Sequence, residues 1–274
     1  ESSRFFRLSN LTFPRFSVIL DTDLFLYERR IFSLNITHKD LVQKQETQDN
    51  NIILYPERFI QNTDNYNALM MMYRCAIREI STKLEVLDDE FSVKHKRNPI
   101  SSIKSRIKQP DSIYRKLKKN GYDFTEKNIR EQLNDVAGIR VTCPFINDIY
   151  TVAKLLGDQD DITVLRIKDY IQNPKENGYR SYHMIVEIPV FFAEGKTPMR
   201  AEVQIRTIGM DFWASLDHQM KYKKDVEDAS EISEELKECA EVIAQTDLKM
   251  LSLRRKIEDR ESKENLLQFD KDPM

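Results

Sequence analysis

Asp135 is a residue whose type and position in the sequence suggest chemistry. It belongs to NDVAGIRVTCPF, residues 134–145, where an expected helix gives way to an expected strand and Gly138 allows a tight turn. An aspartate at such a junction can simply cap or solvate the turn. It can also hold Mg²⁺, which takes one or two carboxylates and fills its shell with water and substrate phosphate. Arg140 follows on the strand and could reach a phosphate.

Glu202 lies in RAEVQIRT, residues 200–207, a segment expected to form a strand. Because side chains alternate between the two faces of a strand, Glu202, Gln204 and Arg206 share one face. The intervening valine and isoleucine can then enter the core from the other face. A carboxylate, an amide and a guanidinium in a row make a polar ledge on a rigid element. An ordinary exposed sheet face gives the same pattern, so the strand alone does not decide its role.

A basic run lies between Ser101 and Asn120. Seven Lys and Arg residues face one acid, Asp111, so the local net charge is +6. Such a patch attracts phosphate, whether on a nucleotide, an RNA or a lipid. If 111–120 is a helix, Ser112 and the helix N-terminus can meet phosphate oxygens. The cationic residues of the run are Lys104, Arg106, Lys108, Arg115, Lys116, Lys118 and Lys119.

A tyrosine-containing loop, NPKENGYRSYH at 173–183, leads into another expected strand. Tyr179 and Tyr182 offer flat faces on which a base can stack. His183 could equally be an ordinary histidine of a sheet. The concentration of aromatic, basic and glycine residues in one loop nevertheless suits a nucleotide. The charged and turn-forming residues of the loop are Lys175, Asn177, Gly178 and Arg180.

The elements that must position these residues form a mixed α/β domain. Apolar residues at helical spacing predict a helix over about 64–96, and a long amphipathic helix is expected over about 227–264. Further helices are predicted at 100–107, 111–120, 125–134, 147–156 and 208–222. Strands are predicted at 139–145, 162–169, 181–190 and 199–207, the last two as an antiparallel hairpin connected by 191–198.

Composition excludes several classes of protein. The chain is 40% apolar and has no apolar run of the roughly 20 residues that a membrane span needs. Its net charge of -2 excludes a globally basic nucleic-acid binder. Three widely spaced cysteines argue against a disulfide framework and for a reducing cytoplasm. There is no P-loop, GxGxxG, HExxH or paired CxxC motif.

Four segments resemble the RelA/SpoT-homologue synthetases, and specifically the single-domain small alarmone synthetases of the RelP (YwaC-like) type. The resemblance covers about 67–257, and 1–62 has no recognised counterpart. The segments are NPISSIKSRIKQPDSIYRKL, LNDVAGIRVTCPFINDIYTV, KDYIQNPKENGYRSYHMIVEIPV and AEVQIRTIGMDFWASLDHQMKYK.

The expected fold class is α/β (α+β). A mixed β-sheet of about five strands, flanked by helices, would form a nucleotidyltransferase-like synthetase domain with long N- and C-terminal helices. This domain, terminal helices included, is expected to span 63–264. A poorly ordered extension is expected at 1–62 and a loose tail at 265–274.

The resemblance implies that ATP donates its β,γ-pyrophosphate to the 3′-hydroxyl of GDP or GTP, giving AMP and ppGpp or pppGpp for the stringent response. Asp135 and Glu202 would hold Mg²⁺ as catalytic carboxylates, and Glu202 would also activate the 3′-hydroxyl. The residues implied for ATP are Arg106, Lys108, Ser112, Lys116, Lys119 and Arg140. Tyr179 would stack on guanine, and the other residues implied for the guanine nucleotide are Lys175, Asn177, His183, Gln204 and Arg206.

Synthesis without hydrolysis is expected, because the hydrolase site of longer family members needs a His-Asp pair and none of the four histidines is followed by Asp. The expected assembly is a homotetramer held by the terminal helices, without membrane association. Two other functions fit parts of the pattern. An RNA-binding module would use the basic run but has no need of Asp135. A related nucleotidyltransferase would pyrophosphorylate ATP or ADP, or modify RNA, without Tyr179 selecting guanine.

Overall fold

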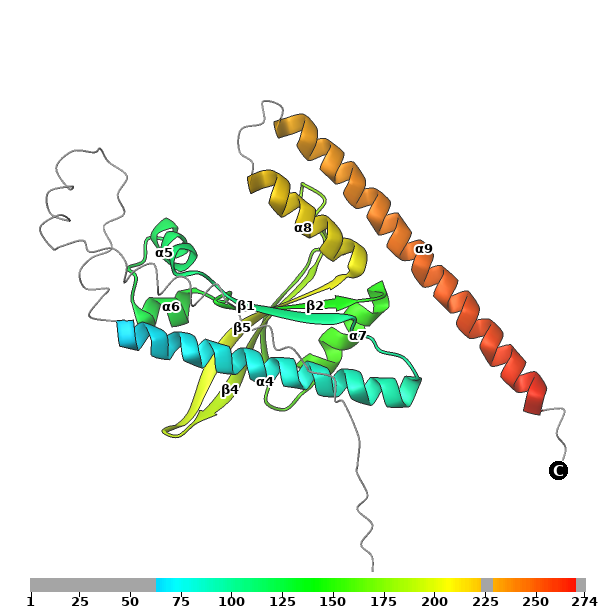
Figure 1. Cartoon of the computed structure of the whole chain (residues 1–274), viewed down its shortest axis with the longest axis horizontal. Helices are drawn as coiled ribbons and strands as arrows, with labels where there is room; N and C mark the ends of the chain where they lie inside the picture. Colours follow the sequence, from blue (N-terminus) through cyan, green and yellow to red (C-terminus); the bar gives the residue numbers. More distant parts are fainter. Residues whose placement is uncertain (1–62, 223–228, 270–274) are drawn as a thin grey trace, which may run out of the picture. The chain divides into compact units, whose positions relative to one another are not determined.

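The structure is a computed structural model that describes residues 63–222 and 229–269 (Figure 1). The expected extension at 1–62 and the last residues of the expected tail, 270–274, lie outside the described residues. Among the helices described, none combines the length and apolarity required to cross a bilayer.

A five-stranded mixed sheet forms the centre of the fold, in the order β1-β2-β5-β4-β3. Strands β2 and β5 are parallel neighbours, and the other neighbouring pairs are antiparallel. The strands are β1 (Ser102–Ile107), β2 (Ala137–Cys143), β3 (Thr163–Asp169), β4 (Tyr182–Phe192) and β5 (Gly195–Thr207). The predicted mixed sheet of about five strands is therefore confirmed.

Helices α4 (Thr63–His95) and α7 (Ile146–Gly157) pack on the sheet and on each other. Figure 1 shows α4 running along the sheet, where it contacts four of the five strands. Its apolar stripe is buried, with Ile80 and Leu84 each 0% exposed. Val203 and Ile205 of β5 are also 0% exposed, which confirms that this strand turns its alternate residues into the core.

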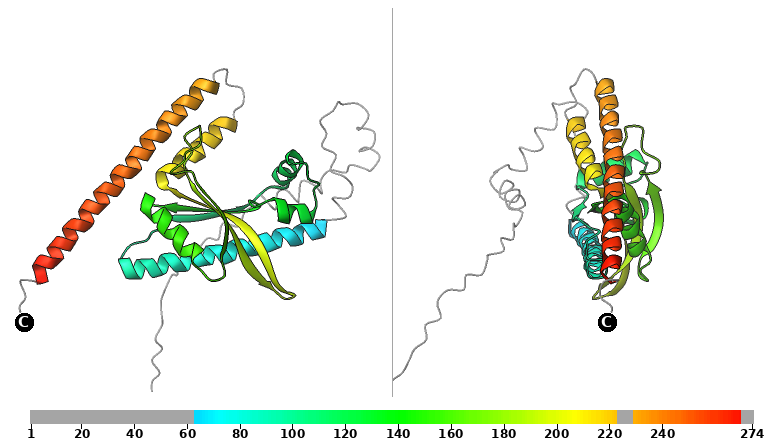
Figure 2. Two further views of the ribbon diagram at one scale, coloured as in Figure 1. Left: turned by 180° about the vertical axis from the view of Figure 1, so that it is seen from behind. Right: turned by 90° about the vertical axis from the view of Figure 1, so that its right-hand side faces the viewer.

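Shorter helices lie at the ends of the strands, and a long C-terminal helix packs on two other helices, α7 and α8. Helices α5 (Pro110–Lys119) and α6 (Glu126–Gln132) connect β1 to β2. Helix α8 (Ile208–Tyr222) follows directly from β5 and lies beside α9 (Ala229–Phe269), as both views in Figure 2 show. Trp213 of α8 donates its Nε1–H to the Leu236 carbonyl of α9 over 2.7 Å, and its ring centroid lies 6.4 Å from that of Tyr179.

A buried carboxylate joins three distant parts of the chain. Asp148 of α7 is 0% exposed and accepts hydrogen bonds from Arg97 at 2.7 Å and from Arg254 of α9 at 3.3 Å. The Arg254 guanidinium also lies 4.9 Å from the centre of the Phe145 ring. A buried carboxylate requires such partners, because an unpaired charge away from water is costly.

Three local predictions were wrong. Residues 102–107 form strand β1, not a helix over 100–107. The hairpin strands continue past the predicted connection at 191–198, so that Pro189 and Pro198 lie opposite each other and the turn falls after Phe192. Gly138 lies within β2 opposite Arg106, not in a turn. The other predicted helices and strands between 63 and 222 are present within a few residues of their expected bounds.

Candidate active site

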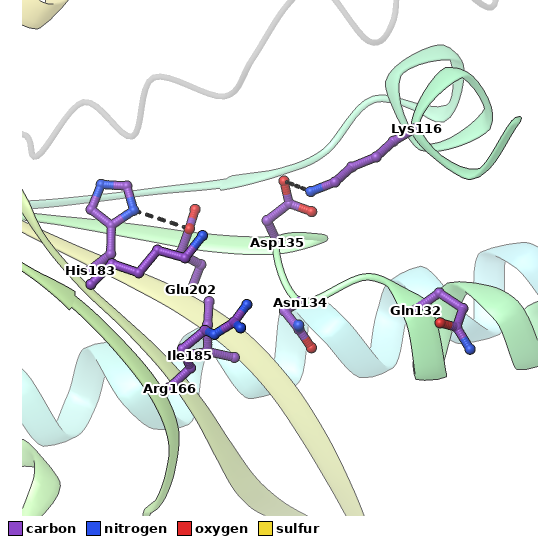
Figure 3. Close-up of a pocket in the computed structure, with 9 residues that line it drawn as sticks. Lys116, Gln132, Asn134, Asp135, Arg166, His183, Ile185 and Glu202 are labelled. Carbon is purple, nitrogen blue, oxygen red and sulfur yellow. Dashed lines mark hydrogen bonds and ion pairs between the residues drawn. The ribbon is translucent and has the colours of Figure 1, made fainter. Parts of the chain in front are cut away.

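A polar pocket opens where α5, the α6–β2 loop and strands β3, β4 and β5 meet (Figure 3). It contains both predicted carboxylates, which come from elements that are far apart in the sequence. The residues that line it are Lys116, Gln132, Asn134, Asp135, Arg166, Lys168, His183, Ile185 and Glu202.

Asp135 is held in the loop between α6 and β2 by its buried neighbours. Leu133 is 0% and Val136 is 1% exposed, so the chain on both sides of the carboxylate is anchored in the core. Asp135 Oδ2 accepts hydrogen bonds from Lys108 Nζ and Lys116 Nζ, each over 2.8 Å. Burial alone would raise the pKa of Asp135, but these two lysines outweigh it and hold the pKa below its ordinary value.

Glu202 lies on β5, opposite Gly138 of β2 and Ile185 of β4. Its Oε1 lies 3.2 Å from His183 Nδ1, and its Oε2 accepts a hydrogen bond from Gln204 Nε2 over 2.8 Å. Burial acts to raise the pKa of Glu202, but the hydrogen bonds with His183 and Gln204 leave it below its ordinary value. Both carboxylates of the pocket are therefore ionised at neutral pH.

Hydrogen bonds continue from Glu202 to the tyrosine loop. Tyr179 Oη lies 2.9 Å from His183 Nε2 and accepts from Arg206 over 2.7 Å. Arg206 also donates to Gln204 Oε1 over 2.8 Å, which confirms that Glu202, Gln204 and Arg206 share one face of β5. Since Arg206 fills an acceptor position on the tyrosine oxygen, the Tyr179 hydroxyl can donate to Nε2, and His183 can donate from Nδ1 to Glu202.

Lys175 and Asn177 shape the loop that carries Tyr179. The Lys175 ammonium lies 4.6 Å from the centre of the Tyr179 ring and 4.7 Å from that of Tyr170. Asn177 Oδ1 accepts a hydrogen bond from the Tyr179 backbone N–H over 3.3 Å. Both residues therefore contact the tyrosine that is predicted to stack on guanine.

Five of the six residues predicted for ATP do not line this pocket: Arg106, Lys108, Ser112, Lys119 and Arg140. Lys108 nevertheless reaches the lining residue Asp135 through its hydrogen bond. Arg140 forms an ion pair with Asp211 at 3.4 Å, and Asp211 also binds Arg206. Burial lowers the pKa of Arg140, and the charge of Arg206 lowers it further. Lys119 is exposed at the end of α5, and Ser112 lies in its first turn.

Five lining residues were not predicted from the sequence: Gln132, Asn134, Arg166, Lys168 and Ile185. Strand alternation places Arg166 and Lys168 on the same face of β3, and Lys168 lies opposite His183 in the sheet. Alternation groups these two basic residues on one face, but only the pairing of β3 with β4 brings that face to the carboxylates. Gln132 and Asn134 flank the buried Leu133 before Asp135, and their residue types gave no chemical signal.

The donor set fits a hard divalent cation. Asp135 Oδ1 is buried without a hydrogen-bond partner, and Glu202 supplies a second ionised carboxylate in the same pocket. Within the described ranges, no three His, Cys, Asp or Glu side chains gather around one point. A metal ion held by two carboxylates would take its remaining ligands from water and substrate phosphate, which is the coordination that Mg²⁺ favours.

Known proteins are similar to this chain in both sequence and fold. A family model described as "Region found in RelA / SpoT proteins" matches residues 105–227. The GTP pyrophosphokinase YwaC of Bacillus subtilis is 41% identical over 195 residues, which cover 71% of this chain and 93% of that protein. The GTP pyrophosphokinase YjbM of the same organism is 30% identical over 194 residues, covering 71% of this chain and 90% of that one.

Solved structures agree with the sequence comparison. Small alarmone synthetase 2 from Bacillus subtilis matches with a TM-score of 0.64 at 40% identity, over 70% of this chain and 99% of that one. Small alarmone synthetase 1 from Bacillus subtilis, bound to its product pppGpp, matches with a TM-score of 0.65 at 30% identity, over 70% of this chain and 98% of that one. This chain belongs to the RelA/SpoT family of GTP pyrophosphokinases, as its motifs predicted. These structural relatives are small alarmone synthetases.

Proposed function

We propose that this chain is a GTP pyrophosphokinase that transfers the β,γ-pyrophosphate of ATP to the 3′-hydroxyl of GDP or GTP, giving AMP and ppGpp or pppGpp. The observation that carries this proposal is one pocket in which Asp135 and Glu202 lie with Lys116, Lys168 and His183. Ionised carboxylates beside lysines and a histidine suit phosphoryl transfer, which depends on positioning and charge neutralisation. The similarity to GTP pyrophosphokinases supports the choice of substrates.

Glu202 is the proposed general base. Its carboxylate is ionised and oriented by His183 and Gln204, so it can accept the proton of the ribose 3′-hydroxyl. The 3′-oxygen then forms a bond to the β-phosphorus of ATP. The bond from that phosphorus to the oxygen bridging the α- and β-phosphates breaks, and the bridging oxygen leaves with AMP.

Asp135 and Glu202 are also the proposed Mg²⁺ ligands, and the bound ion would supply positive charge to the phosphate oxygens during transfer. Lys108 and Lys116 hold Asp135 in place and carry positive charge beside the pocket. Both lysines are proposed to bind the ATP phosphates, with Arg106, Ser112, Lys119 and Arg140 as further predicted contacts.

The acceptor nucleotide is proposed to bind over the tyrosine loop. The Tyr179 ring would stack on guanine. Hydrogen bonds through His183, Gln204 and Arg206 connect this tyrosine to Glu202, the proposed general base. Lys175 lies over the Tyr179 ring, so it is placed to contact either the guanine ring or the phosphates of the acceptor nucleotide. Asn177 fixes the backbone at Tyr179 and completes this proposed site.

A product assay tests the proposed function. The purified chain is incubated with ATP, GDP or GTP and Mg²⁺, alongside Glu202→Gln and a sample with EDTA. AMP and a 3′-pyrophosphorylated guanine nucleotide are expected from the wild type alone. Absence of both products, together with tight and salt-sensitive RNA binding, would instead favour an RNA-binding module. Incubation of ppGpp with the chain tests the expected lack of hydrolysis, since release of pyrophosphate would contradict it.

A homotetramer in the cytoplasm is the proposed state of the protein. Several large apolar side chains along α9 are exposed, which supports a role for this helix in subunit contacts. Light scattering after gel filtration measures the mass of the assembly, and a monomeric mass would contradict the proposal. The exposed apolar residues of α9 are Val242, Leu248, Met250, Leu253 and Ile257.

A further inference from the structure

The loop that carries Tyr179 packs directly against helix α9 at Gly178. Gly178 has a positive φ of 82°, and a Cβ placed on it would lie 2.7 Å from Ala240 Cβ and 3.3 Å from Lys237 Cα. No real side chain tolerates such a contact, so only glycine lets the loop lie this close to the helix. The residue that precedes the proposed base-stacking tyrosine therefore rests directly on α9.

Arg180, the residue after Tyr179, hydrogen-bonds the same loop to α9. One nitrogen of its guanidinium donates to the Gly178 carbonyl at 3.1 Å and to the Ala240 carbonyl of α9 at 3.3 Å. Its second terminal nitrogen donates to Glu241 Oε1 of α9 at 2.8 Å. The planar guanidinium thus spans the loop and the helix with donors in fixed directions, which a lysine could not reproduce. Arg180 therefore serves the helix contact and does not line the pocket.

The end of β5 is held by the same helix. Thr207, next to Arg206, donates its hydroxyl to Asp247 Oδ2 of α9 over 2.6 Å, and its oxygen accepts the backbone N–H of Met210. A Cβ on Gly209 would lie 2.8 Å from Ile243 Cγ2 of α9. Helix α9 therefore contacts the two segments that carry Tyr179 and Arg206, which are hydrogen-bonded to each other.

We propose that α9 is a positioning element for the acceptor nucleotide, and that Arg180 and Glu241 are its positioning residues. They act through Gly178 and Tyr179 and touch no reacting atom. This inference rests on the proposed function, because it assumes that Tyr179 binds the guanine nucleotide. The donor side of the pocket, with Asp135 and Lys116, makes no contact of this kind with α9 among the described residues. Loss of the contacts of Arg180 with Gly178 and α9 should therefore weaken binding of the acceptor nucleotide and leave binding of ATP unchanged.

The test compares Arg180→Lys, Glu241→Gln and the double variant with wild type and with Glu238→Gln. Glu238 is exposed on the same helix and serves as the matched control. Titration calorimetry measures the affinity for GDP and for a nonhydrolysable ATP analogue, and kinetics give KM and kcat. Because the Glu241 side chain is 54% exposed, its substitution leaves the fold intact, which thermal melting verifies.

Arg180→Lys is expected to weaken GDP binding about tenfold, which is about 1.4 kcal/mol. Glu241→Gln is expected to weaken GDP binding by about threefold. The double variant should bind GDP no more weakly than Arg180→Lys, because the two residues act through one shared ion pair. Affinity for the ATP analogue and kcat at saturating GDP should stay within about twofold of wild type. The Glu238→Gln variant should match wild type throughout.

Two results would overturn the inference. One is a Glu241→Gln variant with wild-type GDP affinity, and the other is an equal loss of GDP and ATP-analogue affinity in Arg180→Lys. Both leave the proposed function standing if the wild type makes AMP and the 3′-pyrophosphorylated product. Absence of product from the wild type would overturn the proposed function itself.

Discussion

The Tyr179 hydroxyl and the Glu202 carboxylate are joined by a single imidazole. His183 Nε2 lies 2.9 Å from Tyr179 Oη, and His183 Nδ1 lies 3.2 Å from Glu202 Oε1. The aromatic ring proposed to hold the acceptor base and the carboxylate proposed to take its proton are thus parts of one hydrogen-bonded chain. The position of the Tyr179 ring and the orientation of the Glu202 carboxylate therefore depend on the same imidazole.

Tyr179→Phe and Tyr179→Ala separate stacking from this hydrogen-bonded chain. The phenylalanine keeps the ring and loses the hydroxyl, so we expect a lower kcat with KM for GDP within about threefold of wild type. The alanine also loses stacking, which is worth about 1–3 kcal/mol per base, and KM for GDP should rise by about tenfold or more. Steady-state kinetics at saturating ATP measure both. An unchanged KM in Tyr179→Ala would contradict the stacking role.

Asp135→Asn and Glu202→Gln should each lower kcat by about 10²–10⁴-fold, the range for loss of a group that transfers a proton or stabilises charge. Each amide has nearly the size of the carboxylate it replaces, so melting temperatures should stay close to wild type. Isothermal titration with Mg²⁺ and a nonhydrolysable ATP analogue provides a second readout, in which both variants should bind the ion more weakly. A variant with wild-type kcat would show that the substituted residue has no catalytic role.

Lys116→Ala and Lys118→Ala form a matched pair on one helix. Lys116 donates to Asp135 and lines the pocket, whereas Lys118 lies over the ring of Tyr114. A hydrogen bond to a charged group is worth about 1.5–3 kcal/mol, so KM for ATP should rise by about tenfold or more in Lys116→Ala. Lys118→Ala should keep KM for ATP near wild type. Equal effects in the two variants would indicate only a general attraction by the basic run.

Asp247→Asn should change how stability depends on pH. Burial raises the pKa of Asp247, and the hydrogen bond from Thr207 offsets only part of the rise. The folded state therefore binds more protons than the unfolded state above the ordinary pKa of about 4, and the free energy of unfolding falls as pH rises through the folded pKa. Asparagine is always neutral and still accepts the Thr207 hydroxyl, so this loss should be absent.

Urea denaturation from about pH 4 to about pH 7 measures the effect. The stability of Asp247→Asn relative to wild type should increase with pH, whereas Asp247→Ala should be less stable than Asp247→Asn throughout. A constant difference between wild type and Asp247→Asn would show that Asp247 ionises as easily in the folded chain as in the unfolded one.

Asp148→Ala should lower the free energy of unfolding by about 3–5 kcal/mol, because it removes the buried carboxylate that pairs with both Arg97 and Arg254. Asp158→Ala is the control at the other end of α7. Asp158 is exposed and pairs only with Lys154 among the partners described, so its loss should cost less than about 1 kcal/mol. Chemical denaturation of both variants provides the comparison.

The sequence predicted the ledge on β5 because strand alternation is a local property. Glu202, Gln204 and Arg206 needed only a period of two to fall on one face. The residues that lie beside this polar face could not be predicted in the same way, because their positions depend on which strands pair. Arg166 and Lys168 reach the pocket because β3 pairs with β4, and no pattern within β3 itself shows which face meets the carboxylates.

Strand β1 was mistaken for a helix for a related reason. Ile103 and Ile107 are four residues apart, a spacing that fits one face of a strand as well as one face of a helix. Ile100 completed a helical pattern in the sequence, but it lies before the strand, where its N–H donates to Asp88. The pairing of β1 with β2 is nonlocal, and it decided the structure of the segment.

Trp213 gives the molecule a built-in optical reporter. It is the single tryptophan of the chain, it is 4% exposed, and it lies between the α9 backbone and the Tyr179 ring. Indole emission is sensitive to the polarity and mobility of its surroundings. Unlabelled protein in a cuvette should therefore change its fluorescence as a guanine nucleotide arrives at Tyr179, so that the kinetics of acceptor capture can be followed in real time by stopped flow.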